Sequence, residues 1–347
     1  MSRADKPTFP RDPVTDLRRI AFLLERAHEA TYRVRAFRAA VHVLAECGPE
    51  EVVRRSADNS LRRLHGVGEV TARCVAESLD GHVPVYLRRL EATALTPLDE
   101  ASQQLRALLR GDCHTHSDWS DGGSSIYEMA QAAKELGHEY VALTDHSPRL
   151  TVARGLSAQR LREQLAEVAR INEELTPFRL LTGIEVDILD DGSLDQENDM
   201  LAGLDLVVAS VHSGLRSPSD RMTTRMVTAV SHPRVNVLGH CTGRLISGKH
   251  RPESQFDAEA VFAACAAHEV AVEINSRPER LDPPKRLLRL AVEADCLFAI
   301  DSDAHAPGQL DWQPYGCQRA VACGVDPDRV VNTWPLDRLL AWSMRNH

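Results

Sequence analysis

The feature that most constrains this chain is an alternation, after residue 110, of short β-branched runs with longer helical stretches. The runs occupy residues 112–116, 139–145, 179–187, 205–211, 235–239, 270–275 and 296–301. Alternation of strand and helix is typical of parallel βαβ units, and seven such units are enough to close a barrel-like sheet. We therefore predict a distorted (βα)7 barrel of the α/β class over residues 111–347.

Side chains suited to metal binding lie at or just after the ends of these runs. They are His114, His116, Asp121, His146, Glu185, His212, His240, Asp303 and His305. The carboxyl ends of barrel strands form one face, so these side chains are expected to converge there. His114 and His116 share one side of an extended strand because side chains alternate with period two. Nitrogen and carboxylate ligands without thiolate suit Zn²⁺, Mn²⁺ or Fe²⁺, which predicts a polynuclear metal centre in a hydrolase.

Composition and charge agree with a barrel joined to a smaller domain. With 347 residues, 43% of them hydrophobic, the chain can bury a barrel core and a second small core. No apolar run approaches the roughly 20 residues of a membrane span, and the eight cysteines form no CxxC pair. We expect a soluble cytoplasmic protein with reduced thiols. Residues 1–110 carry 18 Lys and Arg against 15 Asp and Glu, whereas residues 111–347 carry 23 against 35.

The first segment, residues 14–95, reads as entirely helical. Apolar residues recur there at helical spacing, first at Leu17, Ile20, Ala21, Leu24 and Ala27 and then at Val34, Phe37, Ala40, Val41 and Leu44. Gly66 and Gly68 separate two further helical runs. A Gly-x-Gly hairpin of this kind exposes backbone N–H groups that can bind a nucleic-acid phosphate, although an ordinary helix turn explains it equally well. Residues 96–110 read as a polar linker with a short helix-like end.

The motifs of the second segment resemble those of the polymerase-and-histidinol-phosphatase (PHP) domain over about residues 110–347. They are His114-Thr-His116, Asp145-His146, Gly183-Ile-Glu-Val-Asp-Ile, the isolated His212 and His240, and Asp303-Ala-His305. The runs that begin at Trp119, Asp205, Gly239 and Glu273 are most similar to the PHP domain attached to bacterial family-X DNA polymerases. Residues 14–95, with Phe37-Arg-x-Ala and the glycine hairpin, resemble the N-terminal helical, helix-hairpin-helix DNA-binding domain of those polymerases.

The resemblance implies a centre of three divalent ions. It assigns His114, His116, Glu185 and Asp303 to the first ion, Glu185, His212 and His240 to the second, and Asp121, His146 and His305 to the third. Glu185 would bridge two ions. Some relatives have histidine in place of Asp121, and a carboxylate there tilts the third position toward a harder metal such as Mn²⁺.

Two departures from those polymerases narrow the expected activity. Only residues 96–110 stand where the polymerase palm should lie, and a domain needs at least about 50 residues, so we do not expect nucleotide addition. Relatives with lyase activity use a lysine in the helix after the glycine hairpin, but no lysine occurs between Lys6 and Lys134. Arg73 and Cys74 occupy that helix instead, which disfavours Schiff-base chemistry.

The remaining expectation is a metal-dependent phosphoesterase. We predict action on DNA 3′ ends, as a 3′→5′ exonuclease or a 3′-phosphatase/phosphodiesterase in repair, with DNA held through the N-terminal domain. A small-molecule phosphomonoesterase such as a histidinol-phosphatase is one alternative, and a non-catalytic DNA-binding protein with structural metals is another. The predicted catalytic residues are His114, His116, Glu185, His212, Asp303 and His305. The predicted substrate-binding residues are Arg154, Arg216, Arg244, Arg277, Gly66 and Gly68.

Overall fold

The computed structural model describes residues 11–94 and 97–345 and divides the chain into two compact units. The division follows Pro97; we call Met1–Pro97 the N-terminal unit and Leu98–His347 the C-terminal unit. None of the described helices has the length and apolar character that a bilayer span requires. All eight cysteines are unpaired, and all except the partly exposed Cys47 are buried.

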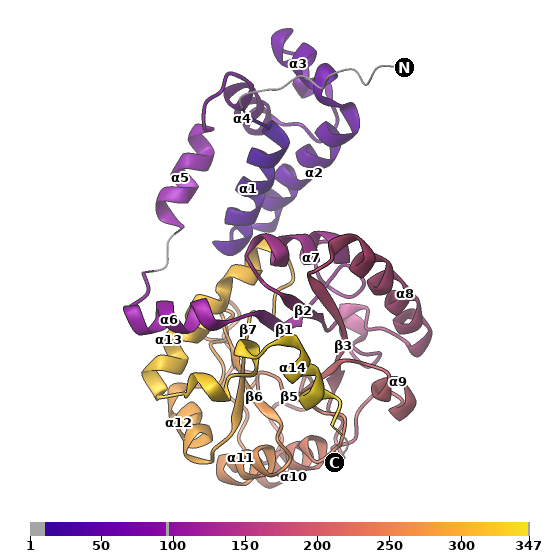
Figure 1. Ribbon diagram of the computed structural model, residues 1–347, viewed down its shortest axis with the longest axis vertical. Helices are drawn as coiled ribbons and strands as arrows, with labels where there is room; N and C mark the ends of the chain where they lie inside the picture. The colour runs from indigo at the N-terminus through magenta and orange to yellow at the C-terminus, as the bar shows by residue number, and fades with distance from the viewer. Residues whose placement is uncertain (1–10, 95–96, 346–347) are drawn as a thin grey trace. The chain divides into compact units, whose positions relative to one another are not determined.

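The N-terminal unit is helical (Figure 1). Its helices are α1 (Pro13–Arg26), α2 (Thr31–Cys47), α3 (Pro49–Ala57), the 3-10 turn η1 (Leu61–Arg63), α4 (Glu69–Leu79) and α5 (Val85–Thr93). Asp12 begins α1 because its carboxylate accepts the N–H groups of Val14 and Thr15. The apolar positions predicted along α1 are buried except Ala27, which lies just beyond the helix end and is exposed.

The two glycines of the predicted hairpin lie between η1 and α4. Gly66 adopts a φ of +96°, and a Cβ there would stand 3.3 Å from the Val43 side chain of α2. Gly68 precedes the first turn of α4, and its N–H donates to Thr71 Oγ1 at 2.9 Å. Glycine is therefore required at position 66 both by its backbone conformation and by the close approach of α2.

The C-terminal unit is a nearly closed barrel of seven parallel strands, which confirms the predicted fold. The strands pair in chain order as β1 (Gly111–Thr115), β2 (Tyr140–Leu143), β3 (Arg179–Asp187), β4 (Leu206–Ser210), β5 (Val237–Leu238), β6 (Ala271–Asn275) and β7 (Leu297–Asp301). β1 meets β7 mainly just beyond the strand ends, where the N–H of His116 donates to the Ala304 carbonyl at 2.8 Å. All seven predicted runs coincide with these strands within a few residues.

Helices surround the sheet (Figure 1). They are α7 (Ile126–Glu135), α8 (Ala158–Leu175), α9 (Asn198–Ala202), α10 (Ser219–Val230), α11 (Ala258–Ala267), α12 (Lys285–Glu293), α13 (Gln313–Cys323) and α14 (Leu336–Ser343), with 3-10 turns η2 (Thr151–Ala153), η3 (Pro307–Trp312), η4 (Pro327–Arg329) and η5 (Val331–Thr333). The strands are almost wholly buried. Burial on both faces explains their continuous apolar sequences.

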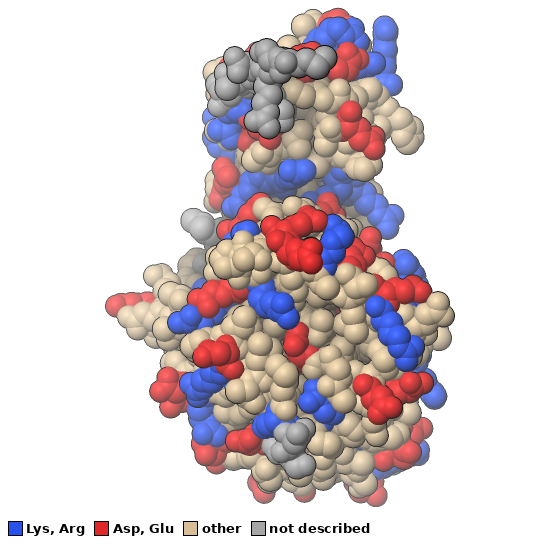
Figure 2. Space-filling model, turned by 45° about the vertical axis from the view of Figure 1, so that its right-hand side comes forward, with Lys and Arg blue, Asp and Glu red and all other residues tan. Residues whose placement is uncertain are grey.

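Part of the stretch expected as a linker belongs to this unit. Residues Glu100–Leu108 form α6, which begins at the N-cap Asp99 and packs against α13. Leu105 and Leu109 of this stretch lie four residues apart and join the core around the barrel, as one face of an amphipathic helix does. On the face shown in Figure 2, positive and negative side chains are interspersed over the C-terminal unit.

Candidate metal centre

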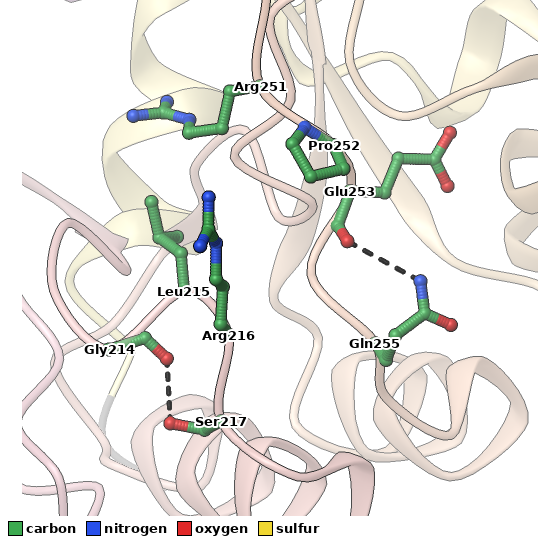
Figure 3. Close-up of a pocket in the computed structure, with 8 residues that line it drawn as sticks. All are labelled: Gly214, Leu215, Arg216, Ser217, Arg251, Pro252, Glu253 and Gln255. Carbon is green, nitrogen blue, oxygen red and sulfur yellow. Dashed lines mark hydrogen bonds between the residues drawn. The ribbon is translucent and has the colours of Figure 1, made fainter.

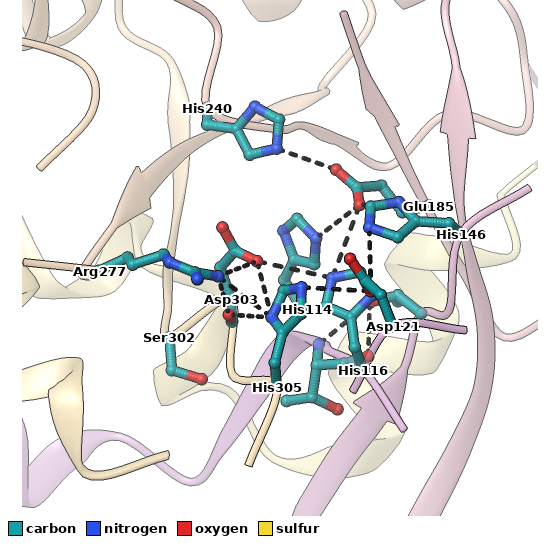
Figure 4. A network of polar contacts seen from close by, with 12 residues as sticks. His114, His116, Asp121, His146, Glu185, His240, Arg277, Ser302, Asp303 and His305 are labelled. Carbon is teal, nitrogen blue, oxygen red and sulfur yellow. Dashed lines mark hydrogen bonds and ion pairs between the residues drawn. The ribbon is translucent and has the colours of Figure 1, made fainter. Parts of the chain in front are cut away.

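All nine predicted ligands lie at the carboxyl ends of the strands or in the loops that follow them. Figure 4 labels all of them except His212. His114 lies on β1 and Glu185 on β3, while His146, His212 and His240 follow β2, β4 and β5. His116 and Asp121 lie just after β1, and Asp303 and His305 just after β7. The side chains converge because parallel strands of a barrel end on one face.

Glu185 is the centre of the cluster. Its Oε1 lies 3.0 Å from His240 Nε2 and 3.3 Å from His212 Nε2. Its Oε2 lies 2.8 Å from His146 Nδ1 and 3.3 Å from His114 Nε2. Burial favours the protonated acid, but these imidazoles outweigh it and hold the pKa of Glu185 well below its usual range. A carboxylate in this position can bridge two cations.

A second set of contacts surrounds Asp121. Its Oδ1 lies 3.5 Å from His146 Nε2 and 3.4 Å from His305 Nε2. The rings of His116 and His305 have centroids 4.2 Å apart, and His116 Nε2 lies 3.5 Å from Asp303 Oδ1. The Asp121 side chain is 38% exposed, whereas Glu185 is fully buried. The solvent-facing edge of the cluster is therefore on the Asp121 side.

Ligand atoms lie within 4.8 Å of one another in three overlapping groups: His116, Asp121, His146 and His305; His114, His116 and Glu185; and His146, Glu185 and His212. His116 thus reaches the Asp121 group as well as Glu185. The resemblance had assigned His116 to one ion only. His240 and Asp303 lie outside these three groups, but they contact Glu185 and His116 respectively.

The cluster has the unsatisfied polar atoms that bound cations would satisfy. Eight buried atoms of the predicted ligand residues make no hydrogen bond with any described residue: His114 Nε2, His116 Nδ1 and Nε2, His146 Nδ1, Glu185 Oε2, His212 Nδ1 and Nε2, and His240 Nδ1. Leaving a buried polar group unpaired costs about 1–3 kcal/mol, so a cluster of them is unfavourable unless something binds there. The atoms approach closely without hydrogen-bond geometry, as ligands around a shared cation do. The residues therefore fit a centre with imidazole and carboxylate ligands.

Two residues of β6 support this centre and were not predicted. Glu273 is fully buried; its Oε1 lies 2.6 Å from His114 Nδ1 and its Oε2 accepts the backbone N–H of His240 at 2.5 Å. Asn275 Nδ2 donates to Glu273 Oε2 at 3.2 Å and to Asp303 Oδ2 at 3.1 Å. β6 thus supplies no ligand but contacts three of them. A glutamate inside an otherwise apolar run was the available sequence signal.

The Glu273 contact places a proton on Nδ1 of the His114 ring. A carboxylate only accepts hydrogen bonds, so Nδ1 carries the proton that it donates to Glu273, while Nε2 lies 3.3 Å from Glu185 Oε2. His305 Nδ1 lies 2.9 Å from the Asp303 carbonyl oxygen and 3.1 Å from Arg277 Nη1, so neighbouring groups hold this ring in place as well. In both residues Nε2 faces a carboxylate of the cluster.

Two arginines flank Asp303. Arg277 Nη1 lies 3.6 Å from Asp303 Oδ1, and Arg280 Nε lies 3.2 Å from Asp303 Oδ2. Burial raises the pKa of Asp303, but Arg277, His116 and Arg280 outweigh it and hold the pKa well below its usual range. Arg277 was predicted as a substrate-binding residue and does lie at the cluster. Arg280, which lies in the same loop, was not predicted.

The other predicted arginines lie elsewhere. Arg244 donates to the carbonyl oxygens of Arg280 and Leu281 and lies 3.4 Å from Glu253. Its guanidinium thus holds two loops together, and a substrate-binding role for Arg244 stays a prediction. Arg154 is exposed and ends η2 in the left-handed conformation.

Arg216 is exposed beside a pocket next to the loop that carries His212. Gly66 and Gly68 belong to the N-terminal unit. The structure therefore brings only Arg277, among the predicted substrate-binding residues, into contact with the metal ligands.

Known proteins are similar to parts of this chain in sequence or in fold. Residues 112–277 match the model of the PHP domain. A Bacillus subtilis (strain 168) protein described as DNA polymerase/3′-5′ exonuclease PolX is 39% identical over 238 residues, which cover 69% of this chain. That match spans 41% of the relative, so the chain corresponds to about two fifths of its length. A probable phosphatase of Thermoanaerobacter sp. (strain X514) is 28% identical over 233 residues, covering 64% of this chain and 89% of the relative.

A crystal structure of histidinol phosphate phosphatase from Lactococcus lactis subsp. lactis Il1403, complexed with zinc, L-histidinol and phosphate, covers 62% of this chain and 92% of its own. The identity is 18% and the TM-score is 0.48. The matched domain, the relatives in sequence and the clustered ligands lead to one assignment. The chain carries a PHP domain at residues 112–277 and is a metal-dependent phosphoesterase.

Proposed function

We propose that this protein hydrolyses phosphoesters at DNA 3′ ends, as a 3′→5′ exonuclease or a 3′-phosphatase/phosphodiesterase in DNA repair. The observation that carries the proposal is the converged ligand cluster with its unpaired buried atoms. The printed 3′-5′ exonuclease description of the Bacillus relative supports the choice of DNA. Nucleotide addition is not proposed.

We propose three divalent ions, drawn from Zn²⁺, Mn²⁺ and Fe²⁺, with Glu185 as the bridge. His114, His116, Glu185 and Asp303 would hold one ion, Glu185, His212 and His240 another, and Asp121, His146 and His305 the third. When bound, such ions supply Lewis acidity toward phosphate oxygens and favour ionisation of water. The shared contacts of His116 make the first and third positions neighbours.

The side chains around these ligands have defined tasks in this proposal. Hydrolysis forms a phosphorus–oxygen bond from water and breaks the bond to the leaving oxygen, which takes up a proton. Arg277 and Arg280 place positive charge beside Asp303, where it favours a phosphate oxygen. Glu273 and Asn275 hold three ligands in position. The exposed Asp121 edge is the side from which a DNA end would enter.

The N-terminal unit would hold the DNA strand in this proposal. Gly68 lies at the start of α4, where backbone N–H groups and the helix dipole favour a phosphate. Arg62, Arg63 and Arg73 are near it in sequence, and all three are exposed. Binding of this kind weakens as salt rises.

A small phosphomonoester, such as histidinol phosphate, is the second candidate substrate. The observation in its favour is that probable phosphatases match this chain over most of their own length, 89% in the Thermoanaerobacter case. This candidate needs the same metal ligands but has no use for the N-terminal unit. The two candidates therefore differ in whether the substrate reaches beyond the metal centre.

The test is a denaturing-gel time course on 5′-labelled single-stranded and recessed 3′-end DNA, with Mn²⁺ or Zn²⁺ supplied. A parallel oligonucleotide ends in 3′-phosphate, and Asp303→Ala is the negative control. Shortening from the 3′ end, or loss of the 3′-phosphate, that is absent in Asp303→Ala supports the proposal. Intact DNA with metal-loaded wild-type protein refutes it, and release of phosphate from histidinol phosphate in that sample supports the second candidate.

A further inference from the structure

A pocket of about 540 Å³ is lined by the segment that follows His212 and by part of the loop after β5 (Figure 3). Its walls are two segments, Gly214–Ser217 after β4 and residues from Arg251 to Gln255 in the long loop after β5. The two walls are joined, since Ser254 Oγ donates to the Leu215 carbonyl at 2.9 Å. Gly214 follows the ligand His212 by two residues, a reach of at most about 7 Å along the backbone. One wall of the pocket is therefore continuous with the loop that carries the ligand His212.

The lining of this pocket is positively charged. Arg216 is exposed and makes no hydrogen bond or ion pair with any described residue, and it extends along the pocket toward the segment that carries Arg251 (Figure 3). Arg251 is half-buried and donates through Nε to the Gly243 carbonyl. The carboxylate of Glu253 is already engaged by Arg244 and Arg286. Two guanidiniums are thus available to an anion.

A third guanidinium connects the pocket with the metal ligands. Arg280 Nε lies 3.2 Å from Asp303 Oδ2, while its Nη1 is buried without a hydrogen-bond partner among the described residues. Burial and the charge of Arg280 both lower the pKa of Arg251, although Asp282 opposes them. Both arginines lie at the Gly243–Arg244 segment, since Arg251 Nε donates to the Gly243 carbonyl and Arg244 Nε donates to the Arg280 carbonyl at 2.9 Å. A buried unpaired donor and two neighbouring like charges are both relieved when an anion binds between them.

We propose that Arg280, Arg251 and Arg216 form a second phosphate site, which binds the phosphodiester adjacent to the reacting phosphate of a DNA strand. This inference rests on the proposed function. A reaction at a 3′ end leaves the rest of the strand on the 5′ side, so the adjacent phosphate is the 5′ one. Guanidinium matches phosphate in a two-pronged hydrogen-bonded pair. A phosphomonoester of a small alcohol has no second phosphate, so this site selects polynucleotides.

The test compares two dinucleotides that differ by one phosphate. In d(TpT) the single phosphodiester is the reacting group, whereas d(pTpT) adds a phosphate on its 5′ side. One charged hydrogen-bonded contact of this kind corresponds to about a tenfold preference, so kcat/KM for d(pTpT) should exceed that for d(TpT) by roughly that factor in the full-length, metal-loaded wild type. Both substrates are too short to make the extended contacts of a long strand.

Arg216→Ala is the principal variant, because Arg216 has no partner within the described fold whose loss would disturb folding. It should reduce the ratio of the two kcat/KM values severalfold, chiefly by raising KM for d(pTpT), and Arg216→Lys should recover part of it. Arg251→Ala should reduce the ratio toward one, with a thermal melt to confirm that the loop anchored at Gly243 remains folded. Arg170→Ala is the matched control, since Arg170 is an exposed arginine of α8 paired with Glu174.

The outcomes separate this inference from the function on which it rests. A wild-type ratio near ten that falls in Arg216→Ala and Arg251→Ala but not in Arg170→Ala supports the second phosphate site. A ratio near one in the wild type, or a high ratio that neither variant changes, overturns the site while DNA hydrolysis stands. Wild-type protein that cleaves neither dinucleotide nor longer DNA overturns both proposals.

Discussion

Replacing Glu273 by glutamine tests whether β6 positions the metal ligands. The buried carboxylate accepts from His114 Nδ1 at 2.6 Å and from the His240 backbone N–H at 2.5 Å. Glutamine has nearly the same shape but offers one acceptor oxygen and one donor amide in place of two acceptors. It cannot satisfy both partners at once, so one of the two contacts must become unfavourable.

Each orientation of the glutamine has a defined cost. If its oxygen faces His114, its amide group opposes the His240 N–H, and the backbone that carries this ligand must move. If its amide group faces His114, the ring must accept at Nδ1, which places the proton on Nε2 and removes the lone pair from the metal side. Loss of a buried charged hydrogen bond costs about 1.5–3 kcal/mol. We therefore expect Glu273→Gln to weaken metal affinity by about 10- to 100-fold.

The assay is competition between the full-length protein and a chromophoric chelator for Zn²⁺ or Mn²⁺, which reads affinity without relying on activity. Urea unfolding of the metal-free protein measures any separate loss of packing. Glu163→Gln is the matched control, because Glu163 is an exposed glutamate of α8. Metal affinity within twofold of wild type would refute the positioning role. If only the free energy of unfolding of the metal-free protein decreased, Glu273 would contribute to packing and not to metal binding.

Three further predictions concern stability. Burial lowers the pKa of His138 to about 3, below the roughly 6.5 of an unfolded chain. As the pH decreases, the unfolded state takes up the proton first, so the stability of the folded state decreases toward acidic pH. The cost between pH 8 and pH 5 is about 2 kcal/mol, and urea titrations at both pH values should show that His138→Leu removes that part of the pH dependence; an unchanged difference contradicts the reasoning. Gly155→Ala would place a Cβ 1.8 Å from the Ser147 carbonyl oxygen, so it should lower the free energy of unfolding by about 3 kcal/mol. Gly203→Ala is the control, because the nearest neighbour of its Cβ would be 3.6 Å away, and it should change the free energy of unfolding by less than about 0.5 kcal/mol. Equal effects of the two variants in the same urea assay would be inconsistent with the steric account. Chelation of metal should lower the Tm of the wild type by removing a ligand that binds only the folded state, and Asp303→Ala should respond much less in the same melting experiment.

The strands and the ligand residues could be predicted because both are local properties of the sequence. Each strand is a short β-branched run bounded by polar residues, and its buried position requires no knowledge of its neighbours. The ligands follow from the strand ends, since every parallel strand of a barrel ends on the same face. His114, Glu185 and Asp303 come together for this reason although up to 189 positions separate them in the chain.

The roles of individual arginines could not be predicted in this way. Arg244 follows a strand-end histidine closely, as a phosphate-binding residue would, yet its guanidinium holds carbonyl groups of the loop around Arg280. Arg280 itself has no such position in sequence and lies at Asp303. A long flexible side chain reaches several places from one backbone position, and only the packed loops decide which it takes.

The sequence by itself determined the barrel, its strands and the residues that could bind metal, because alternation and strand-end position are carried by neighbouring residues. The tertiary structure decided which atoms meet. It placed Glu273 and Asn275 in contact with three ligands, assigned α6 to the C-terminal unit, and brought Arg216 and Arg251 to one pocket. The physical reason is that these contacts join segments far apart in the chain, and their geometry depends on strand register, barrel closure and loop packing.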